Sequence, residues 1–389
     1  MHHPLPFFPE KRLMTPLWIN TDDALAKFLH ALPPGIPVAL DTEFAWTRTY
    51  FPVFALLQIG IDRQTAAIVD ALAIRDWSPL GELLGDATRR KILFSGANDL
   101  PILHRACGVL PANVFDAQIA AGFCGESATQ SLKAVIQEKL GIPLDKSETR
   151  SDWTLRPLTQ KQIDYAAGDV VLLPELATLY EERLKANGNL AWFLEEMETQ
   201  FCREESYRLP PVEDAWHKIG ALRKPLSEEI RGRMVSLALW REEKARDTNL
   251  TRNRLLTDEQ LIWCAYENPQ EESRLYAMPQ CWPKRIRPVA AEILEALKHG
   301  PEALERCGLT VRKRIRPLPK DELKALSDRV LGLSERRARE RQIEPTLVCT
   351  RHDAEHWAIN HLNKTPQDGR ILQGWRNELL HDALALLEK

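Results

Sequence analysis

Short apolar runs separated by polar turns dominate the beginning of the chain. Residues 37–40 form one apolar run that ends on Asp41, and residues 55–61 and 65–69 form two more around the polar turn 62–64. Runs of this length that are bounded by turn residues are typical of β-strands. The pattern therefore predicts a meander of three strands.

Strand and helix signals alternate after this meander. The predicted strands are 91–94 and 113–115, and the predicted helices are 78–84, 98–106, 131–140 and 159–186. Thr159 and Gln162 have the spacing of a capping box, which favours a helix start at residue 159. Strands that alternate with helices indicate an α/β domain whose mixed sheet is flanked by helices. We assign this domain to residues 14–200 and expect residues 1–13 to be a disordered tail.

The second half of the chain is predominantly helical, apart from a weak strand signal at 346–349. It contains a repeat at an offset of 93 residues, which aligns Thr257 with Thr350 and Trp282 with Trp375. A repeat at a fixed offset predicts two copies of one structural module. We place two all-helical domains at residues 212–297 and 305–389. Their tryptophans, Trp240, Trp263, Trp282 and Trp375, are expected to be core residues.

Composition excludes several classes of protein. Of the 389 residues, 44% are hydrophobic and 28% are charged, which is ordinary for folded domains in water. No apolar run reaches the ~20 residues needed to cross a bilayer, and the N-terminal residues lack the pattern of a secretory signal. Seven dispersed cysteines without a C-x-x-C pair argue against a disulfide framework and structural zinc. We therefore expect a cytoplasmic location and no membrane contact.

Local charge is more informative than the net charge of −3. Residues 305–341 contain twelve Lys or Arg against six Asp or Glu. Basic segments of this kind contact nucleic-acid backbones or form solvated helix faces, and the sequence leaves both readings open.

Acidic residues at the ends of predicted elements point to chemistry. Asp41 and Glu43 lie two apart at a strand end, so both side chains project from one face. Asp99 lies at the start of a helix that follows a strand, and Tyr165 and Asp169 share one helix face. Neighbouring carboxylates repel one another unless cations neutralise them, and oxygen-rich sites select hard ions such as Mg²⁺ or Mn²⁺. Taken singly, each acid also fits a turn or a helix cap.

Together, these residues suit two-metal hydrolysis of a phosphodiester. We expect two divalent ions held by Asp41, Glu43, Asp99 and Asp169, with Asp41 as the bridge. Glu43 and Asp169 would complete the nucleophile-side site and Asp99 the leaving-group site. Tyr165 would hydrogen-bond the attacking water.

Three groups of residues resemble the exonuclease motifs of the ribonuclease D family. The first group is 38–44 (VALDTEF), 47–52 (TRTYFP) and 57–60 (LQIG), the second is 96–100 (GANDL), and the third is 145–153 (DKSETRSDW), 156–159 (RPLT) and 165–170 (YAAGDV). The two helical domains are similar to HRDC modules. The resemblance implies a DEDD 3′→5′ exoribonuclease of the tyrosine subtype with a ribonuclease H-like fold. It also implies trimming of structured RNA, chiefly precursor tRNA, with release of nucleoside 5′-monophosphates.

Two positions depart from the family pattern. Asn98 stands where the family usually has Glu, and Gly168 stands where it usually has Ala. Neither departure removes a metal ligand, although each bears on rate or metal preference. Asp116 is expected to be mainly structural, and His104 is expected to lie on a helix surface.

Basic and aromatic residues near the motifs, and basic residues of the segment 305–341, are candidates for contacts with RNA. These candidates are Arg48, Tyr50, Phe51, Lys146, Arg150, Arg312, Lys313, Arg314, Arg336 and Arg337. Two other functions remain open at this stage. One is a DNA 3′→5′ exonuclease of the Werner or proofreading type, and the other is a catalytically idle RNA-binding scaffold.

Overall fold

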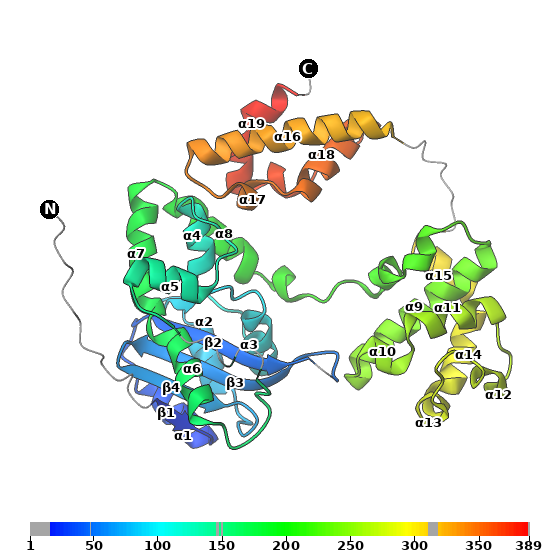
Figure 1. Cartoon of the computed structure of the whole chain (residues 1–389), viewed down its shortest axis with the longest axis horizontal. Helices are drawn as coiled ribbons and strands as arrows, with labels where there is room; N and C mark the ends of the chain where they lie inside the picture. Colours follow the sequence, from blue (N-terminus) through cyan, green and yellow to red (C-terminus); the bar gives the residue numbers. More distant parts are fainter. Residues whose placement is uncertain (1–15, 47, 145–147, 149–150, 310–317, 388–389) are drawn as a thin grey trace. The chain divides into compact units, whose positions relative to one another are not determined.

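The computed structural model describes residues 16–46, 48–144, 148, 151–309 and 318–387. The predicted tail, residues 1–13, lies outside them. The chain forms two compact units, which Figure 1 draws in sequence colours. The first unit contains residues up to 44, residues 54–207 and the C-terminal residues from 318 onward, whereas the second contains the segments 45–53 and 208–309.

A six-stranded mixed sheet forms the centre of the first unit, in the order β1-β4-β3-β2-β5-β6. The strands are β1 (Leu17–Ile19), β2 (Val38–Ala45), β3 (Val53–Asp62), β4 (Thr65–Asp70), β5 (Lys91–Leu93) and β6 (Val114–Asp116). β3 and β4 are antiparallel, whereas β2, β5 and β6 pair in parallel, and so do β1 and β4. The predicted mixed sheet is therefore confirmed.

Helices surround this sheet (Figure 1). They are α1 (Asp22–His30), α2 (Ser78–Gly85), α3 (Asp99–Cys107), α4 (Ala117–Phe123), α5 (Leu132–Leu140), α6 (Gln160–Val171), α7 (Leu173–Ala186) and α8 (Leu190–Phe201). The single helix predicted for 159–186 is in fact two helices. Pro174 lies in the first turn of α7, where its missing N–H is tolerated, and the break falls at Leu172. β1, α1 and α4 were not predicted.

Helix α6 packs closely against one face of the sheet. Leu56 and Ile68 of the sheet form a small buried cluster with Trp153, Ala166 and Ala167. A methyl group added at Gly60 of β3 would approach the carbonyl oxygen of Val170 to 2.6 Å. The absence of a side chain at Gly60 therefore lets α6 lie close to β3.

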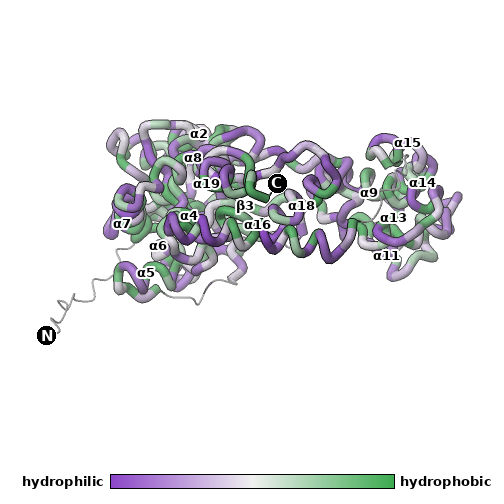
Figure 2. Tube along the Cα trace, turned by 90° about the horizontal axis from the view of Figure 1, so that it is seen from above, coloured by the Kyte–Doolittle hydropathy of each residue, from purple (hydrophilic) through white to green (hydrophobic). Residues whose placement is uncertain are grey.

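The C-terminal helical module belongs to the same unit as the sheet. Its helices are α16 (Lys320–Glu340), α17 (Pro345–Val348), α18 (Arg351–Asn363) and α19 (Gly374–Ala385). The strand expected at 346–349 is therefore wrong: Pro345 begins the short helix α17 instead. In Figure 2, hydrophilic and hydrophobic residues alternate along α16, whose buried positions include Leu326, Val330 and Ala338.

A buried ion pair joins this module to helix α8. The Arg376 guanidinium donates two hydrogen bonds to Glu196, each 2.7 Å long, and the Trp375 indole donates a third at 2.6 Å. Asn189 also donates to the Arg341 carbonyl at 3.0 Å. These contacts lie in one continuous hydrophobic core, so the module and the sheet form one packed body.

The second unit has its own core, built on the long helix α9. Its helices are α9 (Glu228–Thr248), α10 (Arg252–Leu255), α11 (Asp258–Glu267), α12 (Glu272–Leu275), α13 (Pro283–Ile286), α14 (Ala290–Lys298) and α15 (Gly300–Arg306). It also contains the 3₁₀ turns η2 (Val212–Lys218), η3 (Gly220–Arg223) and η4 (Arg287–Val289), whereas η1 (Glu204–Tyr207) belongs to the first unit. The connection between β2 and β3 clusters with this unit. Tyr50 from that connection donates to Glu242 of α9 at 2.5 Å.

The two modules share the spacing that the repeat predicts. α9 and α16 each have 21 residues, and α10 and α11 begin 93 residues before α17 and α18. Thr257 and Thr350 both form capping boxes at the start of the third helix. The similarity ends at the aligned tryptophans, because Trp375 is buried in α19 whereas Trp282 is 73% exposed. The expectation that Trp282 is a core residue is wrong.

No helix within the described part of the chain combines the length and the apolar character that a bilayer crossing requires.

Candidate active site

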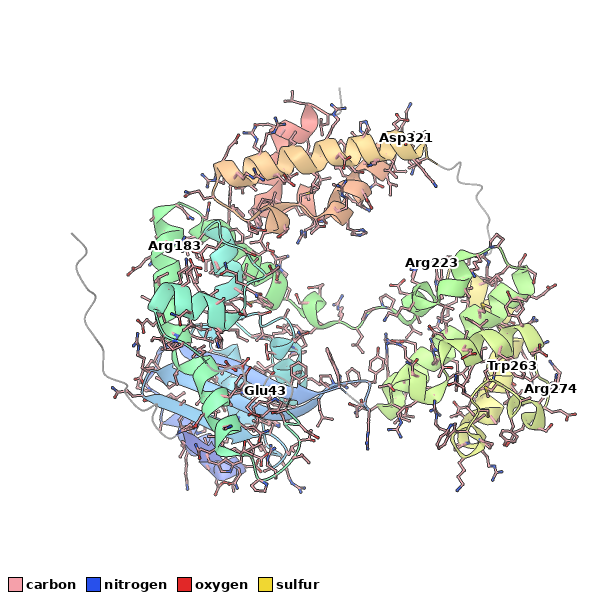
Figure 3. The ribbon with its side chains drawn as sticks, viewed as in Figure 1. Glu43, Arg183, Arg223, Trp263, Arg274 and Asp321 are labelled. Atoms are coloured by element: carbon pink, nitrogen blue, oxygen red, sulfur yellow. The ribbon has the colours of Figure 1, made fainter. Side chains whose placement is uncertain are left out.

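Strand β2 brings two acids to one side of the sheet. Asp41 and Glu43 alternate with Thr42, as their spacing predicts. Carboxylate oxygens of Asp41, Glu43 and Asp169 all lie within 4.8 Å of one another. Figure 3 shows Glu43 on β2, beside the ribbon of α6 that supplies Asp169. The structure thus brings together three acids that are separated by up to 128 positions in the sequence.

Helix α6 positions Asp169 and Tyr165. The capping box between Thr159 and Gln162 begins this helix, as predicted. Tyr165, one turn before Asp169, hydrogen-bonds the Asp169 carboxylate, and its ring lies 5.9 Å from that of Trp153. The tyrosine hydroxyl therefore lies beside the acid cluster.

Asp99 lies next to the three clustered acids and has its own supports. It is a buried residue in the first turn of α3, and it accepts a hydrogen bond from the Thr42 hydroxyl. The loop before it is held by Asp116, which accepts the Gly96 N–H at 2.7 Å and the Ser95 N–H at 3.2 Å. Asp116 also caps α4 through the Gln118 and Ile119 N–H groups. Its observed contacts are those of a structural residue.

Burial and mutual repulsion change the acidity of these carboxyl groups. Burial first, then the negative charges of Asp99, Asp169 and Glu43, raise the pKa of Asp41 well above its usual value. Burial and the charges of Asp169 and Asp99 raise the pKa of Glu43 to about 8. Burial raises the pKa of Asp169 to about 7, against the lowering effect of the Tyr165 hydrogen bond. Burial likewise raises the pKa of Asp99 to about 6.

These electrostatics fit divalent cations. A group of buried carboxylates with raised pKa values takes up either protons or positive ions to remove its repulsion. Oxygen donors without nearby sulfur or imidazole favour Mg²⁺ or Mn²⁺. The donor set therefore suits hard metal ions, with Asp41, Glu43 and Asp169 as the cluster that would hold them. His104 lies elsewhere: its ring contacts Tyr207 and the Val109 carbonyl.

Two polar residues near the site were not singled out from the sequence. Thr42 binds Asp99, and its place between two acids on the strand was the available signal. Gln58 is fully buried in β3, and neither atom of its side-chain amide has a hydrogen-bond partner among the described residues. It lies on the strand between Leu56 and Gly60, which both pack against α6. A polar residue in an apolar strand was the signal for Gln58.

The candidate RNA-contact residues have different surroundings. The Tyr50 hydroxyl is bound to Glu242, and Arg246 and Arg252 lie over its ring at 5.9 and 5.0 Å. Arg48 and Arg336 are exposed. The Phe51 ring packs edge-on against Tyr50, and Arg337 pairs with Glu340 at 3.1 Å. The other five candidates, Lys146, Arg150, Arg312, Lys313 and Arg314, lie outside the described residues.

Comparisons with known proteins agree with this geometry. The family model for the 3′-5′ exonuclease domain matches residues 16–185, and the model for the HRDC domain matches residues 231–297. The chain is 33% identical to ribonuclease D of Escherichia coli K12 over 378 residues, which cover 94% of this chain and 96% of the relative. It is 36% identical to ribonuclease D of Desulfotalea psychrophila over 66% of this chain and 68% of the relative.

Solved structures of ribonuclease D and of RRP6 also resemble this chain. The crystal structure of Escherichia coli RNase D, described as an exoribonuclease involved in structured RNA processing, matches with a TM-score of 0.78 at 30% identity. The match covers 96% of this chain and 98% of the other. The catalytic core of RRP6 from Trypanosoma brucei has the same fold, with a TM-score of 0.62 at 18% identity over 75% of this chain and 80% of the other.

The fold and its acidic edge define a 3′→5′ exonuclease of the metal-dependent DEDD class. The extent and identity of the matches narrow this class further. The chain belongs to the ribonuclease D family and is a 3′→5′ exoribonuclease.

Proposed function

We propose that this exoribonuclease trims the 3′ ends of structured RNA in the cytoplasm, with precursor tRNA as its chief substrate. The printed description of the Escherichia coli structure, which names structured RNA processing, supports this choice of substrate class. That relative and this chain align over nearly their whole lengths, so the proposal extends to the complete arrangement of nuclease and helical modules.

The proposed chemistry is hydrolysis at the terminal phosphodiester. Two divalent ions, Mg²⁺ or Mn²⁺, would supply an activated water and neutralise charge on the phosphate. Asp41 would contact both sites, Glu43 and Asp169 one of them, and Asp99 the other. Tyr165 would orient the attacking water through its hydroxyl, which already lies beside Asp169. The product would be a nucleoside 5′-monophosphate, released one residue at a time.

The observation that carries this proposal is the convergence of three half-buried carboxylates within 4.8 Å of one another. Together with the raised pKa of Glu43, about 8, it describes a site that is repulsive without positive ions. An idle RNA-binding scaffold would not need to keep such a repulsive cluster, which costs stability unless it serves chemistry. The intact set of Asp41, Glu43, Asp99, Tyr165 and Asp169 therefore argues against that alternative.

A substrate panel tests the proposal. The purified chain is incubated with a 3′-extended tRNA, a DNA of matched sequence, and the same DNA with one 3′-terminal ribonucleotide, each with Mg²⁺, Mn²⁺ or a chelator. We expect ladders of shortened tRNA and 5′-monophosphates with either metal, and no product with the chelator. Faster removal of deoxynucleotides from DNA would instead assign the Werner or proofreading type of activity.

A further inference from the structure

The indole of Trp282 is exposed on the surface of the first helical module. It is 73% exposed and directly precedes α13, whereas Trp263 and Trp240 of the same module are half-buried. A large aromatic side chain in contact with water at this level loses the benefit of apolar burial. An exposed indole offers a face on which a nucleic-acid base can stack.

The second copy of the module shows what the aligned tryptophan does when it is covered. Trp375 is 1% exposed, stacks against Trp192 at 5.9 Å and donates to Glu196 of the nuclease domain. In the second unit, Trp282 has no such cover among the described residues. The tryptophan at this position of the repeat is therefore buried in the second module and exposed in the first.

The surroundings of Trp282 are cationic. The segments 251–257 and 279–291, which carry the contacting helices α10 and α13, contain five Lys or Arg and no Asp or Glu. Arg252 is engaged with Glu242. Among the described residues, no carboxylate lies within salt-bridge distance of the other four, Arg254, Lys284, Arg285 and Arg287.

Two of these cations repel each other. Burial lowers the pKa of Arg285, and the positive charge of Arg254 lowers it further. The Arg285 guanidinium donates to the Asn253 carbonyl, which holds it against α10. Since like charges held together are unfavourable until an anion joins them, this arrangement favours a negatively charged partner. A nucleic-acid strand satisfies both features, because its bases stack on aromatic rings and its phosphates pair with guanidinium groups.

We infer that Trp282, Arg254 and Arg285 form a binding surface for a single-stranded stretch of RNA, with one base stacked on the indole and the backbone phosphates held by the two arginines. Lys284 of α13 and Arg287, the first residue of η4, lie close to Arg285 in the sequence and flank this surface; Figure 1 shows α10 and α13. This inference rests on the proposed action on RNA, and it assigns to the first module a substrate contact outside the acidic edge. Contacts of arginines with the phosphate backbone do not depend on base identity, so binding should be independent of sequence.

Binding is tested in full-length chains that carry Asp41→Asn, so that RNA is not consumed. The probes are a 3′-extended tRNA and a short oligoribonucleotide that fills only the acidic edge. We expect Trp282→Ala to weaken tRNA binding roughly 5- to 150-fold, which corresponds to the loss of one stacked base. Tyr266→Ala, which removes another exposed aromatic ring of this module, is the matched control and should leave affinity unchanged.

The role of the two arginines is tested by the salt dependence of RNA binding. Replacing both Arg254 and Arg285 with Ala should flatten the dependence of affinity on salt by about 0.7 log unit per lost phosphate contact on a single strand. Arg274→Ala removes a cation that is already paired with Glu267 at 3.5 Å, and it should not alter the slope. Binding of the short oligoribonucleotide should match the parent in every Asp41→Asn variant, and its cleavage should match the parent when the same substitutions are placed in a chain that keeps Asp41.

The results of these experiments distinguish a failure of the proposed binding surface from a failure of the proposed catalytic function. Unchanged tRNA affinity in both Trp282→Ala and the double arginine variant overturns the inference, and so does an equal loss for the short oligoribonucleotide. If these substitutions leave RNA binding intact but change the mass of the chain in solution, the surface contacts another protein copy, which also overturns the inference. If the parent chain binds tRNA through Trp282 but releases no nucleotide in the presence of Mg²⁺, the proposed function fails while the surface stands.

Discussion

The two helical modules have the same spacing of elements but different relations to the nuclease domain. The second module shares a core with the sheet, and its Arg376 is buried in an ion pair with Glu196 of α8. The first module has a separate core, and its Glu242 binds Tyr50 from the connection between β2 and β3. One copy is thus part of the nuclease body, whereas the other keeps an open cationic and aromatic surface. A repeated module need not repeat its role.

Replacing the aligned tryptophans should give the largest difference between the two modules. Trp375→Ala should lower the free energy of unfolding of the first unit by about 3–5 kcal/mol, because it leaves a cavity beside Glu196 and Trp192. Trp282→Ala should change it by less than about 0.5 kcal/mol, since the indole is exposed. Chemical denaturation followed by circular dichroism gives both values. Equal losses would show that the two modules are anchored alike.

The acidic edge and the first module should respond oppositely to pH. Without metal, the folded pKa of Glu43 is about 8, above its unfolded value of 4.5. Unfolded chains therefore bind fewer protons than folded ones between these values, so stability falls as pH rises from about 4.5 to 8. Glu242 has its pKa lowered to about 2 despite burial, by hydrogen bonds from Arg252, Tyr50 and Arg246. Its contribution is present above pH 4.5 and is lost as pH falls toward 2.

Thermal melting with chelator and with Mg²⁺ measures this effect. We expect a loss of a few kcal/mol at pH 8 relative to pH 5.5, since each unit of pKa difference corresponds to about 1.4 kcal/mol. Mg²⁺ should restore most of the lost stability at pH 8, because the ions occupy the acid cluster in place of protons. Chelated protein that melts at the same temperature at both pH values would contradict the repulsive character of the edge.

A smaller effect should follow from Tyr50→Phe. This change removes a hydrogen bond to a charged group, for which about 1.5–3 kcal/mol is typical, but it keeps the ring between Arg246 and Arg252. The loss should be confined to the second unit. Hydrogen exchange resolves it: faster exchange is expected in α9 and α10, with the backbone of α8 and α16 unchanged. Uniform acceleration across both units would contradict separate cores.

The smallest predicted effect is a gain in stability. Among the described residues, a methyl group at Gly168 would meet only Leu144, at 3.9 Å, so alanine fits there without strain. Gly168→Ala should therefore stabilise α6 by about 0.5–1 kcal/mol, because glycine loses more conformational freedom in a helix. A denaturation midpoint that does not move, or that falls, would show that the glycine serves another purpose beside Asp169.

The sequence carried most of the information on the nuclease domain. Buried strands read as apolar runs, and the capping box at Thr159 predicted the start of α6. The acids at 41 and 43 were expected to share a face because alternation in a strand is a local property. Their meeting with Asp169 is not local: it depends on Gly60, which allows α6 to lie against β3.

Other features were beyond a linear reading. The split between α6 and α7 at Leu172 was missed because the helical periodicity continues through Pro174. Trp375 is buried and donates a hydrogen bond to Glu196 of α8, whereas Trp282 is exposed. Helical periodicity does not encode this difference, because it depends on what packs against each module. The partnerless amide of Gln58 is likewise visible only once β3 is packed. The assignment of site roles and domain boundaries remains a prediction from the sequence.

The most direct test of the central claim is a single-turnover assay of the Asp41→Asn chain on 3′-extended tRNA with Mg²⁺. Asp41 lies in the acid cluster, so its replacement should reduce the release of nucleoside 5′-monophosphates to the level seen with chelator. The melting temperature of the variant should stay at or above that of the parent without metal, because one repelling charge has been removed. Release at the parent rate from this folded variant would contradict the proposed role of the acidic edge.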